Sequence, residues 1–250
     1  MFSIDPGAMP VVIILVFLLA GVVKGIMGMG MPTVAVGLMS LFLTPIEAAG
    51  ILILPGFLTN VWQMLAGPAL RAVLRRLAGM LIGIVAGTAL GVAFLAGHSS
   101  MFTVFALGAV LSAYALLALG ALPLSMPARH ETWLGPLAGL ITGILSGGTG
   151  IFVIPMVPYI ASLGLGREVL IQALGTAFTV AVLALGLSLW FFGKLTPDAA
   201  GWSMLAVIPA FIGMAMGQWL RARLEAETFR RVFLWSVLAL GIWMMIRAAV

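Results

Sequence analysis

The residues of this sequence whose types and spacing could do chemistry gather in two glycine-rich stretches. Residues 25–32 read GIMGMGMP, and residues 143–150 read GILSGGTG, with Pro155 following. Interior glycine costs a helix about 1 kcal/mol relative to alanine, and interior proline costs about 3 kcal/mol. The sequence therefore predicts one helix that breaks within residues 25–32 and a second that breaks within residues 143–150.

A broken helix in apolar surroundings exposes backbone groups that can bind an ion. Amides at the start of a half-helix carry a partial positive charge and suit an anion. We therefore expect an anion between the two breaks, with hydroxyl donors from Ser146 and Thr149. The other residues assigned to this site because they lie in or beside the breaks are Gly25, Gly28, Gly30, Pro32, Thr142, Gly143, Gly147, Gly148 and Gly150. The alternative is close helix packing through small residues, which we favour for Gly83, Gly87, Gly91, Gly213 and Gly217.

Lys24 is the one charged residue placed well inside a predicted span. A lysine at the centre of a membrane helix costs about 2.5–3.5 kcal/mol on insertion scales, so it should face a polar cavity. Two alternatives are a side chain that reaches toward the interface and one that pairs with carbonyls freed at the break. We interpret Lys24 as a substrate-binding residue.

Other polar residues in or near the spans have two readings each. Glu47 and Glu168 lie at helix starts, where the helix dipole favours a carboxylate; the other reading is proton or cation coupling. Asn60, Gln63, Gln172 and Thr176 either bind neighbouring helices together or line the site. Tryptophans near span ends, Trp62 among them, are predicted as interface anchors, and the methionines as core residues.

Composition limits the class of protein. The 250 residues are 63% hydrophobic and only 8% charged, whereas a soluble domain carries about 25% charged residues. Long apolar runs without alternation select membrane helices over a membrane barrel. No cysteine is present, which excludes disulfides and thiolate chemistry. The net charge of +5 fits arginine-rich cytoplasmic loops better than nucleic-acid binding.

The chain divides into two similar halves. Six stretches are predicted to span the membrane, namely 46–65, 77–95, 101–122, 169–192, 199–220 and 232–246. Ahead of each set of three lies a hairpin with a break, over 11–43 and 133–163. We place the first membrane repeat at 1–122, a connecting loop at 123–132 and the second repeat at 133–250.

The repeat is supported by matched residues, including Glu47 with Glu168 and Gly87 with Gly213. Arginine-rich loops follow the span at 46–65 and the span at 199–220, and these loops are not equivalent in the repeat. Because cytoplasmic loops collect arginine, equivalent loops fall on opposite sides of the membrane. We therefore predict an all-α polytopic membrane protein with two inverted-topology repeats, each a broken or re-entrant helical hairpin plus three spanning helices.

The two glycine breaks with their prolines, at Gly25 to Pro32 and Gly143 to Pro155, resemble the TauE/SafE family of sulfite exporter-like membrane permeases. The stretch from Ile208 to Gly217, with Pro209, Ala210 and Gly213, is similar to that family's pattern in a later span. The resemblance extends over about residues 10 to 248 and implies a multi-pass permease of the bacterial inner membrane. It also implies secondary transport of small anions, often sulfite or organosulfonates.

The function expected from the sequence is secondary transport of a small, sulfur-containing oxyanion by alternating access at the bilayer midplane. An anion channel and an auxiliary membrane subunit without transport of its own stay as alternatives. An intramembrane enzyme is disfavoured because the spans contain no cluster of histidine and carboxylates. We expect no cofactor and no metal, a small anion and the lipid bilayer as partners, and no nucleic acid. A coupling proton or cation and a homo-oligomer are left open.

Overall fold

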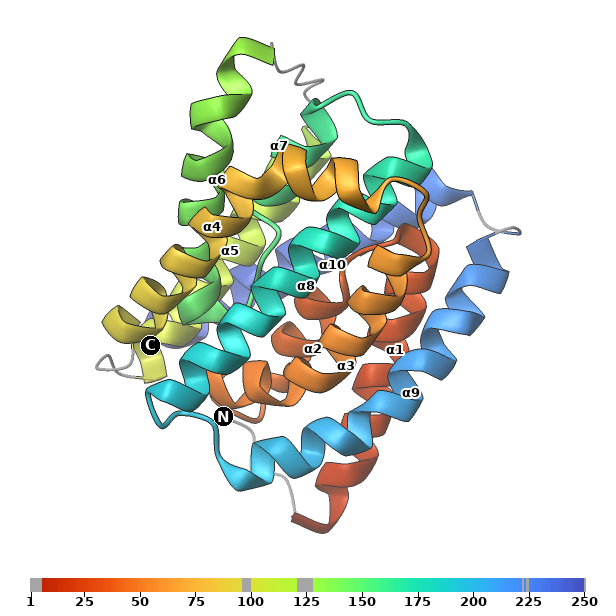
Figure 1. Cartoon of the computed structure of the whole chain (residues 1–250). Coiled ribbons are helices and arrows are strands. Elements are labelled where there is room, and N and C mark those ends of the chain that lie inside the picture. Colours follow the sequence, from red (N-terminus) through yellow and green to blue (C-terminus); the bar gives the residue numbers. More distant parts are fainter. Residues whose placement is uncertain (1–5, 96–99, 121–127, 222, 224, 250) are drawn as a thin grey trace.

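The fold is a bundle of helices (Figure 1), seen in a computed structural model that describes residues 6–95, 100–120, 128–221, 223 and 225–249. A short 3-10 turn, η1 (Pro6–Ala8), leads into the first helix. The α-helices are α1 (Met9–Met27), α2 (Met31–Met39), α3 (Pro45–Leu65), α4 (Leu70–Leu95), α5 (Ser100–Leu119), α6 (Ala128–Thr149), α7 (Met156–Ser162), α8 (Arg167–Phe191), α9 (Pro197–Arg221) and α10 (Ala226–Ala249). The described residues form no strand. The prediction of an all-α polytopic membrane protein is therefore confirmed.

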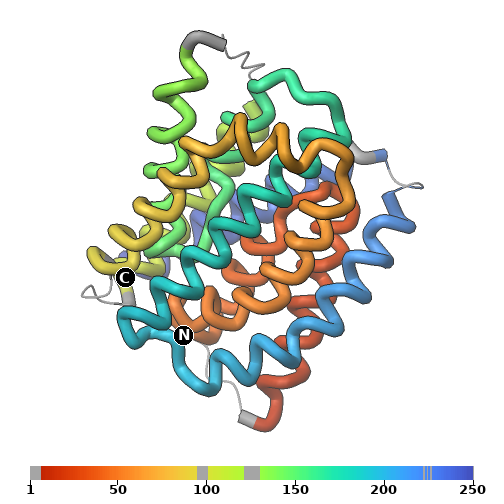
Figure 2. Tube along the Cα trace, in the orientation of Figure 1, coloured from red at the N-terminus to blue at the C-terminus, as the bar shows by residue number. Residues whose placement is uncertain are grey.

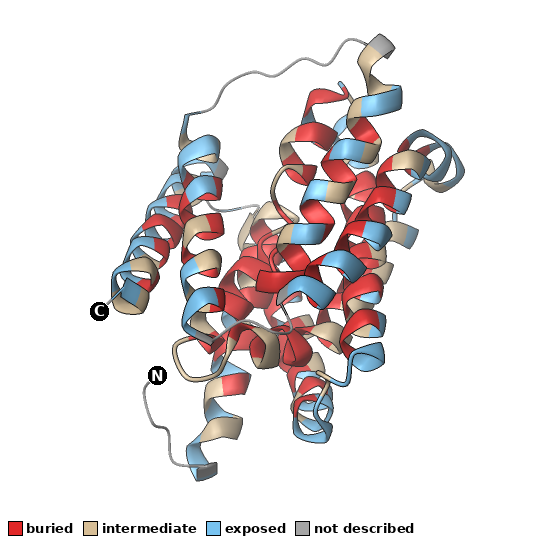
Figure 3. Cartoon of the chain, turned by 90° about the vertical axis from the view of Figure 1, so that its left-hand side faces the viewer, coloured by how far each residue is buried: buried red, intermediate tan, exposed pale blue. Residues whose placement is uncertain are grey.

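Seven of the described helices are long and apolar enough to cross a membrane: α1, α3, α4, α5, α8, α9 and α10. Six of them are the predicted spans, and α1 is the seventh. Figure 3 shows buried residues concentrated in the middle of the bundle and exposed ones along its outside. Large apolar side chains lie on that outside, such as Ile82 and Ile208, which are 70% and 69% exposed. An apolar outer surface is what a lipid environment requires.

The first predicted break is present. Helix α1 ends at Met27, and Gly28 and Gly30 both adopt positive φ angles, 78° and 101°, before α2 begins. Glycine adopts this left-handed conformation without the steric cost that a side chain would bring. The amide of Gly28 donates to the carbonyl of Lys24 at 2.7 Å, which closes the last turn of α1.

The second break lies later than predicted. Helix α6 continues to Thr149, so residues 143–149 are helical, and the chain leaves the helix at Gly150, where φ is 71°. An irregular segment then runs to Pro155 before the short helix α7 begins. Residues 143–149 stay helical because Gly143 and Gly147 allow close packing against α4, which stabilises the helix despite its glycine content. The prediction of a break within 143–150 was wrong except at its last residue.

Two predicted boundaries also move. Helix α4 begins at Leu70, so Arg71, Arg75 and Arg76 lie in its first turns rather than in a loop. Helix α6 begins at Ala128 and therefore includes the end of the predicted connecting loop, 123–132; residues 121–127 lie outside the described part. The start of α3 lies within one residue of the predicted span 46–65, and the structure shows Thr44 as its cap with Pro45 in the first turn.

Helix pairing follows the two halves. Helix α1 packs on α9, and α6 packs on α4; α3 packs on α9, and α8 packs on α4. Helices α3 and α8 pack on each other, as do α5 and α10. Replacing each helix by the one five places further along the chain, or five places back, turns this set of pairs into itself. This is the pairing expected if 1–122 and 133–250 are two copies of one unit.

Glycines form the closest of these helix contacts. A side chain at Gly21 or Gly25 of α1 would meet the backbone of α9, including Met214. In the same way, a side chain at Gly139 or Gly143 of α6 would meet the backbone of α4. The packing role predicted for Gly83, Gly87, Gly91, Gly213 and Gly217 is therefore confirmed, since a Cβ on any of them would meet the backbone of the partner helix.

Apart from Arg247 in the last turn of α10, the arginines of the described helices gather at one end of the bundle (Figure 1). The turn between α3 and α4 and the start of α8 lie together at this end, whereas the turn between α8 and α9 and the C-terminal end of α10 lie at the other (Figures 1 and 2). We call it the arginine-rich end, because it holds Arg71, Arg167, Arg221 and Arg230.

Candidate functional site

A cavity of about 440 Å³ opens at the arginine-rich end, beside the first break. Its walls come from the end of α1, the end of α3, the start of α8 and the end of α9. The lining residues are Lys24, Gly25, Gly28, Trp62, Gln63, Ala66, Gly67, Pro68, Glu168, Ile171, Gln172, Met214, Gln218 and Arg221. Small-molecule sites in proteins enclose about 300–1,000 Å³, so the volume suits a small ligand.

Lys24 is the central charged group of this cavity. It is only 4% exposed. It lies one turn before the break, and its side chain reaches α3. Its ammonium donates to the hydroxyl of Thr59 at 3.0 Å and to the side-chain oxygen of Asn60. Among the described residues, no carboxylate lies within ion-pair distance of it. Lys24 is therefore a buried amine that is hydrogen-bonded to neutral groups and has no carboxylate partner among the described residues.

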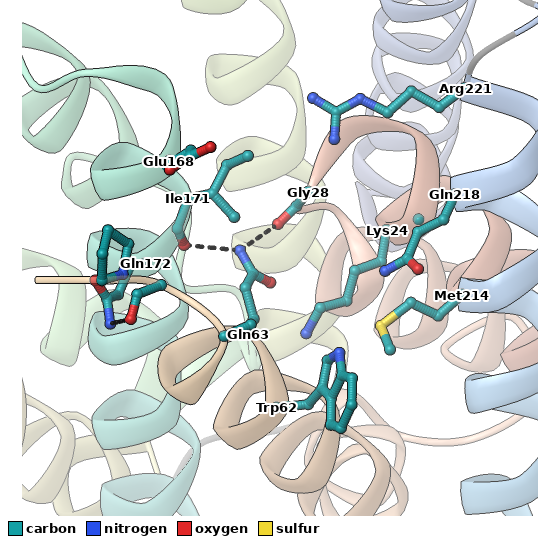
Figure 4. A pocket seen from close by; sticks show the side chains of 14 residues that line it. Lys24, Gly28, Trp62, Gln63, Glu168, Ile171, Gln172, Met214, Gln218 and Arg221 are labelled. Atoms are coloured by element: carbon teal, nitrogen blue, oxygen red, sulfur yellow. Dashed lines mark hydrogen bonds between the residues drawn. The ribbon is translucent and has the colours of Figure 1, made fainter. Parts of the chain in front are cut away.

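Gln63 connects the first break to the second half of the chain. Its amide nitrogen donates to the carbonyl of Gly28 at 3.0 Å and to the carbonyl of Ile171 at 2.9 Å (Figure 4). The first carbonyl belongs to the break and the second to α8. Gln63 therefore fixes the wall of the cavity, and both of its N–H donors are used in doing so.

Gln172 holds the turn between α3 and α4. Its side-chain oxygen accepts from the amide of Ala69 at 2.7 Å, and its nitrogen donates to the carbonyls of Met64 and Gly67, each at 2.8 Å. A fully buried glutamine with all of these bonds made is a structural group. Gln172 lines the cavity, but its polar atoms are already engaged.

Glu168 and Arg221 lie at the rim of the cavity. Figure 4 shows the guanidinium of Arg221 pointing across the opening in the direction of Glu168, while the ammonium of Lys24 points toward Gln63 and Trp62. The indole of Trp62 is 61% exposed even though it lines the cavity. Charged groups and an aromatic face therefore occur in one cavity, an arrangement that can bind an anion and its carbon substituent.

The residues predicted from the second break lie elsewhere. Thr142, the counterpart of Lys24, accepts from the amide of Met156 at 3.1 Å. Ser146 donates to the carbonyl of Gly143 at 2.9 Å, and Thr149 donates to the carbonyl of Leu145 at 2.7 Å. Helical Gly143 and Gly147 pack on α4, and Gly150 packs on Val36 and Ala49. None of these residues, nor the buried Gly148, lines the cavity.

The remaining predicted site residues divide in the same way. Gly30 and Pro32 are buried next to the cavity wall without lining it, and Thr176 donates to the carbonyl of Gln172 at 2.8 Å within its own helix. Glu47 lies away from the cavity, where its carboxylate accepts from the amide and the hydroxyl of Thr44, each at 2.8 Å. The structure thus brings together Lys24, Gly25, Gly28, Gln63, Glu168 and Gln172, with Asn60 behind Lys24.

Sequence reasoning missed the contribution of α9 and the role of Trp62. Met214, Gln218 and Arg221 recur at three and four residues, so they share one helix face. Gly217 lies on α9 beside this face and packs on Gly25 of α1. The spacing of Gly213 and Gly217 was the available signal, because a helix that packs on α1 through these glycines must place its next residues beside Lys24.

Together, the seven apolar helices of the described residues define a multi-pass membrane protein with a charged cavity at one end. A profile of the family described as sulfite exporter TauE/SafE matches residues 13–244. The chain therefore belongs to the TauE/SafE family, which is a family of transporters and not of enzymes. No curated protein and no solved structure matches the chain. Family membership supports a multi-pass membrane transporter of sulfur compounds.

Proposed function

We propose that this protein is a secondary transporter of small sulfur-containing oxyanions, such as sulfite or an organosulfonate, in the bacterial inner membrane. The observation that carries the proposal is Lys24, which is 4% exposed, lines the cavity and has no carboxylate partner among the described residues. An uncompensated buried cation is costly, and an anion that enters the cavity would remove that cost.

The substrate-binding residues in this proposal are fewer than the sequence indicated. Lys24 contacts the anion, Asn60 and Thr59 orient its ammonium, and Gly25, Gly28, Gln63 and Gln172 form the walls. Because cytoplasmic segments collect arginine, the cavity at the arginine-rich end opens to the cytoplasm.

Transport requires that the site open to the other side in turn. The internal repeat supports a rocking movement of one half against the other, as in transporters built from inverted repeats. The close packing of Gly150 on Val36 and Ala49 favours a transporter over an open channel, since no described cavity connects the two ends through the second break. The coupling ion in this scheme is a proton or a cation.

The test is a thermal-shift screen of the purified protein with sulfite, sulfate, ethanesulfonate, sulfoacetate and acetate, repeated with Lys24→Ala. We expect at least one sulfur oxyanion to raise the unfolding temperature of the wild type. Hydrogen bonds to charged groups contribute about 1.5–3 kcal/mol, so Lys24→Ala should weaken that anion about 10- to 100-fold. Equal shifts of the unfolding temperature in the wild type and in Lys24→Ala would show that Lys24 does not take part in anion binding.

Flux measurements with the same protein separate transport from the alternatives. In proteoliposomes, a secondary transporter gives saturable uptake that follows an imposed ion gradient. Uptake that rises linearly with anion concentration would indicate a channel. An auxiliary subunit would move no anion by itself.

A further inference from the structure

Three helices bring charged groups to the cavity. Lys24 comes from α1, Glu168 from α8 and Arg221 from α9. Arg167 is a like-charged neighbour of Arg221, but it does not line the cavity. The lining thus carries two positive charges and one negative charge, with the carboxylate and one of the cations at the rim (Figure 4).

The carboxylate of Glu168 is not used in holding the fold together. Its counterpart Glu47 caps α3 through Thr44. Helix α8 begins instead after Gly166, which has no side chain to form such a cap. Glu168 has no hydrogen-bond or ion-pair partner among the described residues. The two carboxylates occupy equivalent places in the repeat, yet only Glu168 faces a cavity.

We propose that Glu168, opposite Arg221 at the rim of the cavity, lowers the positive charge of the lining and thereby favours monoanions over dianions. This inference rests on the proposed anion site. A monoanion bound near Lys24 balances the two positive charges and one negative charge of the lining, whereas a dianion leaves an excess negative charge. Excess charge is costly in the low-dielectric surroundings of a membrane protein, so the neutral combination is the preferred one.

Coulomb energy gives this proposal a quantitative form. The interaction of Glu168 with a bound anion is proportional to the anion's charge, so it doubles from a monoanion to a dianion. Removing the carboxylate should therefore tighten binding n-fold for a monoanion and n²-fold for a dianion. At the separations across such a cavity we expect about 3-fold and about 10-fold. Removing the charge of Arg221 should weaken binding by the same pair of factors.

The experiment measures affinities of ethanesulfonate and sulfoacetate, a monoanion and a dianion of similar size, by isothermal titration calorimetry on the purified full chain. The variants are Glu168→Gln and Arg221→Gln. The matched controls are Glu47→Gln, at the equivalent position of the other half, and Arg223→Gln, which removes a nearby arginine that stacks on Trp219 at 3.4 Å outside the cavity. We expect both controls to bind the two ligands as the wild type does.

Equal tightening of both ligands by Glu168→Gln would overturn the proposal, and so would a control that reproduces the effect of its partner. Unchanged affinities in Glu168→Gln, with Lys24→Ala still deficient, would reject the charge selection and leave the anion site in place. A wild-type protein that binds neither ligand nor sulfite would instead reject the proposed function.

Discussion

The two helix breaks have the same backbone conformation at their first residue but lie in different surroundings. Each follows a glycine-packed helix and begins at a glycine with positive φ, Gly28 in the first and Gly150 in the second. The first break faces a cavity of about 440 Å³ and has Lys24 one turn before it. The second break is packed against α2 and α3, and Thr142 replaces the lysine.

The two breaks therefore differ in their surroundings, although the helices that precede them are packed in the same way. The seams that hold α1 on α9 and α6 on α4 are alike, because both halves need the same close packing. The first half supplies Lys24, which is buried without a carboxylate partner among the described residues, and the second half supplies Glu168 and Arg221 to the same cavity. In the second half, the hydroxyl of Thr142 at the equivalent position accepts a hydrogen bond from the backbone amide of Met156. Substitutions at matched positions can therefore separate the helix packing that both halves share from the anion binding proposed for the cavity at the first break.

The largest effects are expected at the shared seams. A side chain at Gly25 or Gly143 would meet backbone atoms of the facing helix, which cannot move aside cheaply. Overpacking costs about 1–3 kcal/mol, and we expect Gly25→Leu and Gly143→Leu each to reach the upper end or more. The measurement is the yield and melting temperature of the monodisperse protein. Gly201→Ala is the control, since nothing lies within 4 Å of that position. Damage in only one half would contradict equivalent seams.

A strong effect confined to the first half is expected from Asn60→Asp. The new carboxylate would lie in hydrogen-bond contact with the ammonium of Lys24 and neutralise it. An anion would then compete with a charge-assisted bond of about 1.5–3 kcal/mol, so its affinity should fall about 10- to 100-fold. Calorimetry measures the affinity, and the melting temperature should stay near that of the wild type. Thr59→Val removes the other acceptor without adding charge and should change affinity far less. If Asn60→Asp bound the anion with wild-type affinity, Lys24 would not contact the anion.

The opposite pattern is expected from Thr142→Val in the second half. The amide of Met156 would lose its acceptor in a fully buried position. Leaving a buried donor unsatisfied costs about 1–3 kcal/mol, so the melting temperature should drop while anion affinity is unchanged. Thr142→Ser keeps the hydroxyl and serves as the control. Loss of affinity in Thr142→Val would show that the second break takes part in binding.

The smallest effect concerns the helix starts. Thr44 and Glu47 form a reciprocal cap on α3, which α8 lacks. Replacing such a cap by alanine costs about 1 kcal/mol, so Thr44→Ala should lower the melting temperature by a few degrees. Gly166→Ala at the start of α8 should change it by less than half as much. Equal shifts at the two positions would contradict the difference between Glu47 and Glu168.

The predictions that succeeded from the sequence depend on local signals. The apolar runs predicted the six spans, and Glu47 lies in the first turn of α3, as expected of a carboxylate at a helix start. Lys24 was recognised because a lone charge in an apolar span must have a polar neighbour. The family resemblance was confirmed over residues 13–244.

The second break was misplaced because glycine has two uses that look alike in a sequence. In residues 143–149 the glycines bring α6 against α4, and the packing offsets their cost to the helix. In residues 28–30 they supply positive φ angles that end α1 and start α2. Density of glycine does not distinguish the two uses, since the distinction depends on whether another helix lies alongside.

The sequence by itself determined the class of protein and the spans, and it singled out Lys24 as a charged residue within an apolar helix, because each follows from composition or from spacing along one helix. Only the tertiary structure decided that the cavity belongs to the first break, that Trp62, Gln218 and Arg221 line it, and that Glu168 faces it while Glu47 does not. These facts depend on contacts between α1, α3, α8 and α9, which are distant in the chain. Such contacts are fixed by how helix faces fit together, and this fit is a property of the assembled bundle.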